Sequence, residues 1–270
     1  MVLDGRSVKQ CDSLIAGHHD LIKTFNSPWF LFKPLVTHEY TFYQLLRHYP
    51  QYQFLVPRYF GCVEYLENTY ICLSDLTYGM KYPCVMDLKM GVRQYGDDAK
   101  PDKIERMKAK VASTTSSTLG VRFCGYSIWN RNGSINTKRD KFLGRKLSQQ
   151  GVNTIVKSFF ASSNSEIRLD VVEALLDKVE SFYDFFRSLG NNRAFRFYST
   201  SLLLVYDADP LNLNLTNCAI IDFAHTHLTA NLPIDDGYEL GLSTVINVLR
   251  EILLNPSANY HVADENDLFQ

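Results

Sequence analysis

An aspartate and a lysine lie two residues apart near the end of an apolar stretch, in segment 83–91 with the sequence Pro-Cys-Val-Met-Asp-Leu-Lys-Met-Gly. Side chains of a strand alternate between two faces, so Asp87 and Lys89 would share one face while methionine and leucine fill the other. A carboxylate can orient or deprotonate a hydroxyl, and a neighbouring ammonium can neutralise a phosphoryl group in transfer. Gly91 frees the backbone directly after the pair. These residue types predict phosphoryl-transfer chemistry.

Such chemistry also needs a cation for the nucleotide phosphates and a carboxylate for a metal ion. Lys33 ends a hydrophobic strand and Glu39 begins the next helix, although a lysine at a strand exit beside a surface helix has the same spacing. Asp222 follows the apolar run 219–221. A buried carboxylate needs a cationic partner such as a metal ion, or else Asp222 is a helix cap or a turn residue.

A stripe of cationic residues follows the Asp87–Lys89 pair in the sequence. Lys103, Arg106 and Lys110 are spaced at i, i+3 and i+7, so they share one face of a predicted helix over 102–117. Lys108 lies off that face. The stripe is either a solvated surface or a binding face for an anionic ligand.

Segment 83–91 resembles the Pro-x-x-x-Asp-x-Lys-x-Gly signature of the inositol polyphosphate kinase family in every fixed position. Lys-Pro at 33–34 followed by Glu-x-x-Phe-Tyr, Ser-Leu-Leu at 201–203 and Ile-Asp-Phe-Ala-His at 221–225 are similar to further family motifs in the family's order. The resemblance spans 33 to about 225. Within that span, segments 91–99, 118–122 and 144–148 resemble the hexakisphosphate kinase branch.

The resemblance implies a function for each candidate. It implies that Lys33 binds the ATP phosphates, that Asp222 with Ser201 holds magnesium, and that Lys89 bridges the γ-phosphoryl group and the acceptor. Asp87 would either orient the acceptor hydroxyl or hold the ribose. The implied inositol phosphate ligands, besides Lys89, are Lys103, Arg106, Lys110 and His225. The implied adenine-binding hinge, acting mainly through backbone groups, is Ser74, Asp75 and Leu76, where many family members begin with glutamate.

The implied reaction is ATP- and magnesium-dependent phosphorylation of inositol hexakisphosphate to a diphosphoinositol. One alternative is a kinase of the same family acting on a free hydroxyl of inositol tris- to pentakisphosphate. Another is a catalytically silent module that only binds inositol phosphates. The absence of Gly-x-x-x-x-Gly-Lys-Ser/Thr and His-Arg-Asp motifs argues against a P-loop enzyme and an ordinary protein kinase.

The pattern of elements predicts an α+β fold with two lobes, of the ATP-grasp or protein-kinase type. The predicted β-rich N-lobe covers 1–75, with strands within 13–22 and 29–34, a helix from Glu39 to before Pro50, and a hairpin around 67–68. The predicted C-lobe covers 76–270, with the inositol phosphate segment at about 93–120. Its other predicted elements are a hairpin after Val121, a helix over 166–189, strands at 202–206 and 219–223, and a helix over 238–254.

Composition limits the remaining possibilities. The 270 residues are 46% hydrophobic with a formal net charge of −1, which suits a large core and argues against general nucleic-acid binding. Six scattered cysteines without a Cys-x-x-Cys pair predict reduced thiols. The histidines at 18–19, 225 and 227 lack zinc-ligand spacing. No apolar run is long enough for a membrane span, and no signal peptide is visible, so we expect a cytoplasmic or nuclear protein. The sequence predicts no oligomeric state.

Overall fold

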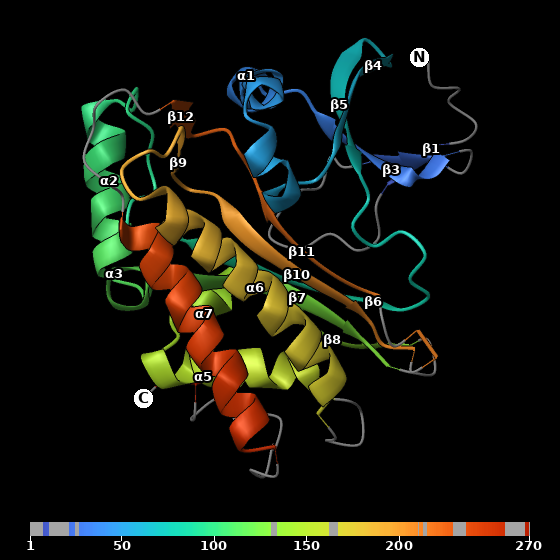
Figure 1. Cartoon of the computed structure of the whole chain (residues 1–270), viewed down its shortest axis with the longest axis vertical. Coiled ribbons are helices and arrows are strands. Elements are labelled where there is room, and N and C mark those ends of the chain that lie inside the picture. Colours follow the sequence, from blue (N-terminus) through green and yellow to red (C-terminus); the bar gives the residue numbers. More distant parts are fainter. Residues whose placement is uncertain are drawn as a thin grey trace.

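The computed structural model describes residues 8–10, 22–24, 27–130, 134–161, 167–209, 211–212, 215–228, 236–256 and 268–269. Two five-stranded sheets dominate this part of the chain, the first at the upper right of Figure 1 and the second across its middle. Segment 75–82 connects them, so the predicted lobe boundary at residue 75 falls between the two sheets.

The first sheet is antiparallel throughout, in the order β1-β2-β3-β5-β4. Its strands are β1 (Val8–Gln10), β2 (Ile22–Thr24), β3 (Ser27–Pro34), β4 (Tyr59–Tyr65) and β5 (Asn68–Ser74). Between β3 and β4 lie α1 (Thr37–Leu45) and the 3-10 helices η2 (Leu46–His48) and η3 (Pro50–Leu55). The predicted strand β3 and the β4–β5 hairpin are confirmed. The helix predicted from Glu39 to before Pro50 begins two residues earlier as α1, and its last part is the 3-10 helix η2. The strands predicted within 13–22 lie outside the described residues, apart from Ile22.

The second sheet is also antiparallel, in the order β11-β10-β6-β7-β8. Its strands are β6 (Pro83–Met90), β7 (Val121–Trp129), β8 (Ile135–Arg139), β10 (Ser201–Asp207) and β11 (Thr216–Ile221). A small separate sheet pairs β9 (Phe195–Phe197) with β12 (Thr226–Leu228). The helices of this region are α2 (Pro101–Ala112), α3 (Ser116–Leu119), α4 (Lys141–Gly144), α5 (Gln149–Phe160), α6 (Leu169–Leu189) and α7 (Asp236–Leu254).

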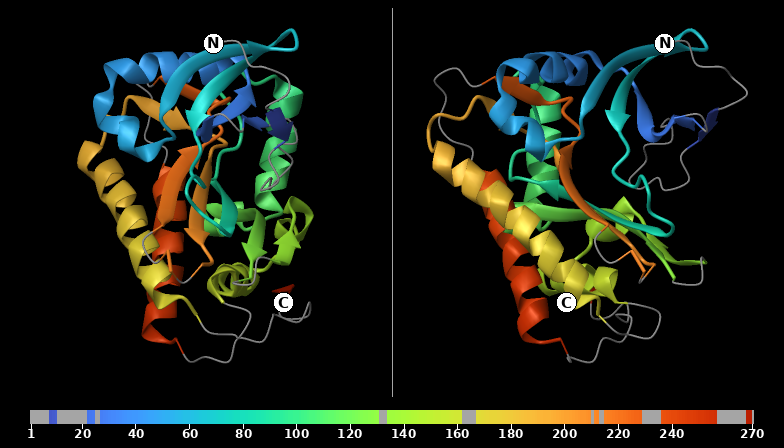
Figure 2. Two further views of the ribbon diagram at one scale, coloured as in Figure 1. Left: turned by 90° about the vertical axis from the view of Figure 1, so that its right-hand side faces the viewer. Right: turned by 45° about the vertical axis from the view of Figure 1, so that its right-hand side comes forward.

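The second sheet has two unlike faces because its side chains alternate. Met86, Leu88 and Met90 of β6 are fully buried in the main core, which α5, α6 and α7 complete (Figures 1 and 2). The neighbouring positions 85, 87 and 89 point to the opposite face. There, Val85 and Val205 form a separate small cluster with Leu76 of the connecting segment. The alternation predicted for β6 is therefore confirmed.

Two predicted helices have different bounds in the structure. The helix predicted over 102–117 ends at Ala112 and resumes only at Ser116, because the Thr114 hydroxyl donates to the Lys110 carbonyl at 3.0 Å and competes with the helical backbone bonds. The helix predicted to begin at Glu166 begins at Leu169. Ile167 instead pairs with Ala161 in an isolated β-bridge, which keeps it out of the helix.

A buried carboxylate fixes the entry of the connecting segment into the second sheet. Asp207, 1% exposed, accepts hydrogen bonds from the backbone N–H groups of Lys81, Tyr82 and Asp209 at 2.8 to 2.9 Å. The Asn212 amide donates to it as well, at 2.8 Å. Burial alone would raise the pKa of this carboxyl, but the four donors outweigh it and lower the pKa below the usual range.

Asp207→Asn should therefore lower the unfolding free energy by about 3 kcal/mol at neutral pH, since an amide cannot accept all four bonds. A group whose folded-state pKa is depressed contributes stability above its unfolded pKa and loses it as pH falls. The difference between wild type and variant, measured by urea denaturation, should shrink below about pH 4. Asp184→Asn on the exposed face of α6 is the matched control. A difference that stays constant from pH 7 to pH 3 would contradict this explanation.

Two general features complete the description. Cys62, Cys72, Cys84, Cys124 and Cys218 are free thiols, and Cys11 lies outside the described residues. Among the described helices, none combines the length and apolar character needed to cross a membrane.

Candidate active site

An ion-paired lysine joins the two lobes. Lys33, in β3, contacts Glu39 of α1 at 2.9 Å and the Asp222 carboxylate after β11 at 2.7 Å. Burial alone would lower the pKa of the Lys33 ammonium, but the two carboxylates outweigh it and raise the pKa. Lys33 therefore stays charged, next to the carboxylate predicted to hold a metal ion. The structure brings together three residues that are separated by 6 and 189 positions in the sequence.

The backbone of Asp222 explains how its carboxylate reaches Lys33. Its φ of 69° lies in the left-handed region, which aspartate and asparagine tolerate better than most residues. The turn breaks the alternation of β11. Phe223 anchors it, fully buried and stacked on Phe42 of α1 with ring centroids 4.0 Å apart. Its backbone N–H also donates to Glu39 at 3.4 Å.

The second sheet places the other predicted residues in adjacent rows. Lys89 is the register partner of Ser201 on one side and Arg122 on the other, and direct partners point to the same face of a sheet. In the next row, Asp87 is paired with Leu203 and is 3% exposed. Lys89, Ser201 and Asp87 thus share the face opposite the main core. The Lys89 ammonium donates to the Ser199 carbonyl at 2.6 Å.

A cluster of cations extends this face towards α2. The Lys103 ammonium lies 3.3 Å from Nε2 of His225, and burial together with Lys103 lowers the pKa of His225. Burial also lowers the pKa of Lys110, reinforced by the positive charges of Arg122 and Arg145. The positive charge of Lys89 also contributes to lowering the pKa values of Lys110 and His225. Charges of one sign crowded in this way disfavour one another, so the cluster suits a polyanionic ligand.

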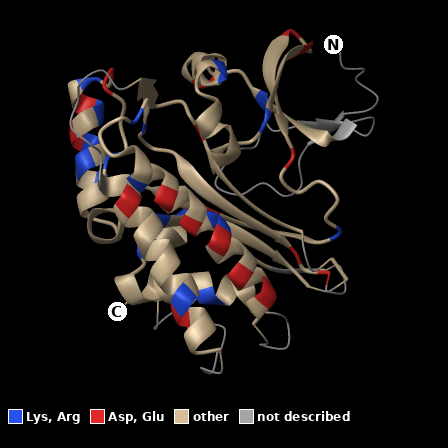
Figure 3. Ribbon diagram, viewed as in Figure 1, with Lys and Arg blue, Asp and Glu red and all other residues tan. Residues whose placement is uncertain are grey.

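The predicted stripe is only partly drawn into this cluster. Lys103 and Lys110 are half-buried and Arg106 is exposed; within the described part of the chain no contact joins Arg106 to the cluster. Figure 3 shows basic residues along α2. Arg122 joins the cluster as the register partner of Lys89. Arg145, which follows α4, was not among the predicted ligands, because only the packing of that helix brings it to the cluster.

The predicted hinge is held mainly by backbone bonds. Ser74 donates its N–H to the Arg58 carbonyl and Asp75 donates to the Trp29 carbonyl, both at 2.8 Å. The Asp75 carboxylate accepts from Thr77 at 2.7 Å. Leu76 instead packs on the small apolar cluster of the sheet face. The two N–H groups are thus engaged within the fold, and Leu76 supplies an apolar surface at the same place.

The described residues contain no group of three histidine, cysteine or carboxylate side chains placed to hold a metal ion. Asp222 offers carboxylate oxygens beside Lys33, and the Ser201 hydroxyl lies in the row of Ile221, directly before Asp222. Magnesium is commonly bound by one or two protein oxygens together with nucleotide phosphates. These residues therefore fit a nucleotide-borne divalent ion better than an all-protein metal cage.

A model of the inositol polyphosphate kinase family matches residues 70–250. The chain belongs to the inositol polyphosphate kinase family. The resemblance predicted from the sequence motifs is thereby confirmed, and several curated relatives are hexakisphosphate kinases, as the branch motifs indicated.

Mouse inositol hexakisphosphate kinase 3 is 33% identical over 216 residues, which cover 71% of this chain and 53% of that protein. Hexakisphosphate kinase 1 of Saccharomyces cerevisiae is 39% identical over 144 residues, covering 53% of this chain and 13% of that protein. The chain spans about half the length of the mouse and human hexakisphosphate kinases 3.

Solved structures of inositol phosphate multikinases share the fold. Ipk2 of S. cerevisiae, in complex with ADP and Mn²⁺, has a TM-score of 0.73 at 24% identity, covering 83% of this chain and 99% of that one. A second multikinase structure has a TM-score of 0.65 at 27% identity, covering 80% and 99%. The predicted two-lobed α+β kinase fold of this family member is confirmed.

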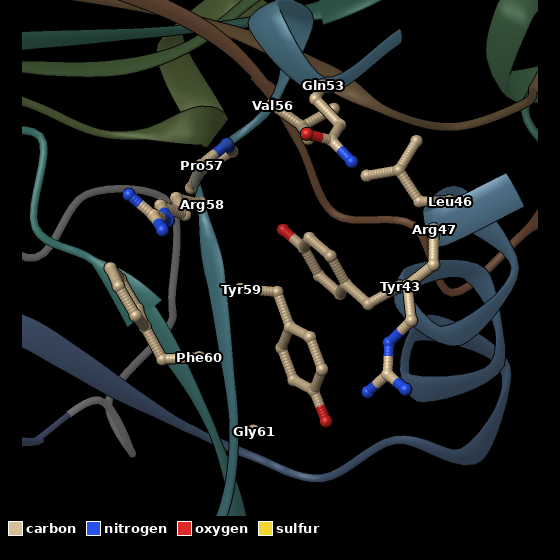
Figure 4. Close-up of a pocket in the computed structure, with 10 residues that line it drawn as sticks. All are labelled: Tyr43, Leu46, Arg47, Gln53, Val56, Pro57, Arg58, Tyr59, Phe60 and Gly61. Atoms are coloured by element: carbon tan, nitrogen blue, oxygen red, sulfur yellow. The ribbon is translucent and has the colours of Figure 1, made fainter. Parts of the chain in front are cut away.

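A cavity of about 540 Å³ lies between α1, the 3-10 helices η2 and η3, and β4. Figure 4 shows its lining, with the rings of Tyr43 and Tyr59 next to each other and their centroids 5.3 Å apart. None of the predicted site residues lines it. Tyr43 nevertheless touches Phe223, with centroids 5.5 Å apart, so the cavity wall adjoins the anchor of Asp222. The lining residues are Tyr43, Leu46, Arg47, Gln53, Val56, Pro57, Arg58, Tyr59, Phe60 and Gly61.

Proposed function

We propose that this protein is an ATP- and magnesium-dependent kinase that phosphorylates inositol hexakisphosphate to a diphosphoinositol. The observation that carries the proposal is the strand register of the second sheet. There, Lys89 is paired with Ser201, next to Ile221 and Asp222, on one side and with Arg122 of the cationic cluster on the other. A kinase needs cations for the nucleotide, an oxygen ligand for a metal and cations for the acceptor, all on one surface. The names of the hexakisphosphate kinase relatives support the choice of acceptor.

The ion pair forms the nucleotide side of this proposal. Lys33 would bind the ATP phosphates, with Glu39 holding its ammonium in place. Asp222 and Ser201 would hold the divalent ion, which neutralises charge on the phosphates when bound. Magnesium is our choice of ion, and the neighbouring multikinase structure with ADP and Mn²⁺ supports a nucleotide with a divalent cation.

The cationic cluster forms the acceptor side. Lys103, Lys110 and His225 would bind the phosphates of the inositol ring, and Lys89 would lie between the acceptor and the γ-phosphoryl group. An oxygen of an acceptor phosphate forms the new bond to the γ-phosphorus, and the bond from that phosphorus to the ADP oxygen breaks. Because the attacking oxygen is already anionic, this reaction needs no general base. Asp87 then either orients the acceptor or holds the ribose.

The first alternative is a family member that phosphorylates a free hydroxyl of inositol tris- to pentakisphosphate. The similarity of the fold to inositol phosphate multikinases supports this alternative. Purified protein should be assayed with ATP, magnesium and each acceptor. A product of hexakisphosphate that contains a phosphorus–oxygen–phosphorus linkage supports our proposal. Turnover restricted to acceptors with a free hydroxyl would support the alternative.

A catalytically silent binding module is the second alternative. A binder needs the cationic cluster but neither a metal ligand nor an ion-paired lysine, and Asp222 with Lys33 provides both. Inositol phosphate binding without any magnesium-dependent ATP consumption would favour the module. Localisation in the cytoplasm or nucleus stays a prediction that cell fractionation can test.

Reversing charge on the cluster tests the substrate class. Lys103→Glu combined with Lys110→Glu should raise the KM for inositol hexakisphosphate at least about tenfold, because two charge-assisted contacts to phosphate become repulsive. Acceptors with fewer phosphates should be affected less. Wild-type binding should weaken more steeply with salt than binding by the variant, since more ionic contacts are screened.

The matched control is Lys108→Glu on the same helix, where the lysine is exposed and lies 3.3 Å from Glu105. It should change KM little, and thermal melting of both proteins should stay near that of wild type. Equal, small effects on every acceptor would mean that α2 presents an ordinary solvated face.

A further inference from the structure

A second contact joins the two lobes at the start of α1. Asp98 precedes α2, and its carboxylate lies 3.8 Å from Nδ1 of His38 in α1. Its other oxygen lies 3.4 Å from Nε2 of His227 in β12. The two imidazole rings stand edge to face, with centroids 6.2 Å apart. One carboxylate therefore bridges a histidine of the N-lobe and a histidine of the small C-lobe sheet.

The backbone before Asp98 is fitted closely to this contact. A Cβ atom on Gly96 would lie 2.5 Å from Nε2 of His227 and 2.6 Å from Oδ1 of Asp98, so any larger residue would displace both. The Asp97 N–H donates to the same Nε2 at 3.2 Å. The Asp97 side chain pairs with Arg93, which in turn donates to the Tyr198 hydroxyl at 3.0 Å. Segment 93–98 is thus held at several points.

The negative charge of Asp98 has no explanation if the surrounding charges serve only to bind phosphates. Its carboxylate acts against the lowering of the pKa of His225, opposite in sign to Lys103 and Lys89. A carboxylate within reach of this cluster repels a polyanionic acceptor. Binding of inositol phosphate gives no reason for a negative charge here, whereas a contact between the lobes does.

We propose that Asp98 is a positioning residue that ties the nucleotide side of the site to the acceptor side. This inference rests on the proposed function. His38 directly precedes Glu39, the partner of Lys33, and Asp98 is five residues from Lys103, which contacts His225. Holding His38 against Asp98 thereby fixes the start of α1 relative to the start of α2. The distance between Lys33 and Lys103 across the site then stays constant.

The ring of His227 is held by the segment that carries Asp98. Its Nε2 accepts from the Asp97 N–H at 3.2 Å and lies 3.4 Å from the Asp98 carboxylate. The charged and titratable groups around the bridge are Lys103 of α2 and, in the connecting segments, Arg93, Asp97, Tyr198 and His225.

The test compares Asp98→Asn and His38→Gln, singly and together, with Asp102→Asn as the control. Asp102 is exposed in the first turn of α2, so its replacement removes the same charge four residues away. Both aspartate variants should lower the KM for inositol hexakisphosphate slightly. Asp98→Asn and His38→Gln should each lower kcat about threefold, and the double variant should be no slower than the slower single variant.

Hydrogen exchange gives a readout that needs no turnover. Amides of 37–45 should exchange about threefold faster in Asp98→Asn than in wild type and should be unchanged in Asp102→Asn. The inference is overturned if Asp98→Asn matches Asp102→Asn in both kcat and exchange. It is equally overturned if the effects of Asp98→Asn and His38→Gln on kcat multiply in the double variant. A wild-type protein without turnover of any inositol phosphate would contradict the proposed function instead, and the exchange rates would still decide the positioning by Asp98.

Discussion

Asp222→Asn should reduce kcat roughly a thousandfold while the protein stays folded. The change removes the anionic oxygen of the proposed metal ligand at nearly constant volume, and magnesium prefers carboxylate oxygen. Asparagine tolerates the left-handed backbone at this position, where φ is 69°. Lys33 keeps Glu39 as a partner at 2.9 Å, so its charge is not left buried alone. The measurement is the initial rate over a series of magnesium concentrations.

Two further measurements separate loss of the metal ligand from loss of the fold. The melting temperature of Asp222→Asn should stay close to that of wild type, and Asp184→Asn on α6 should retain full activity. If Asp222 holds the metal ion, the magnesium concentration needed for half-maximal rate should also rise in any residual activity. An undiminished rate with unchanged magnesium dependence would show that Asp222 serves only as the partner of Lys33.

Local patterns predicted the elements that carry the site. The alternation in 83–91 predicted that Asp87 and Lys89 share a face, because a strand with a fully apolar second face has only one way to lie on a core. The spacing of Lys33 and Glu39 predicted a strand followed by a helix. In each of these cases the signal lies within about ten residues, where backbone geometry alone decides which side chains are neighbours.

Contacts between distant segments were not predictable in this way. The approach of Arg145 to Lys110 depends on how α4 packs, and the bridge of Asp98 to His38 depends on how the lobes meet. The helix α5 was missed although Ser148 marks its start, where the hydroxyl accepts from the Gly151 N–H at 3.0 Å. The small sheet of β9 and β12 has strands of three residues, too short for an alternating pattern to stand out.

Lys89→Ala should lower kcat by roughly a hundredfold or more and change the KM for ATP much less. In its proposed position between the acceptor and the γ-phosphoryl group, Lys89 stabilises the phosphoryl group most strongly in the transition state of transfer. Nucleotide affinity should depend more on Lys33, which belongs to the ion pair with Asp222. Steady-state rates with ATP and inositol hexakisphosphate varied in turn would separate the two effects. A loss confined to the KM for ATP would show that Lys89 is a ground-state nucleotide contact.

The contact of Lys89 with the Ser199 carbonyl at 2.6 Å provides a second explanation that the experiment must separate. Ser199 has a φ of 56°, so the lysine could act by holding a strained turn beside Ser201 rather than through its charge. Ser199→Gly relieves that strain, because glycine adopts positive φ without a steric penalty. If Lys89 acts on the turn, adding Ser199→Gly to Lys89→Ala should restore much of the rate. If it acts by neutralising charge in transit, the double variant should stay as slow as Lys89→Ala, because glycine at 199 supplies no cation.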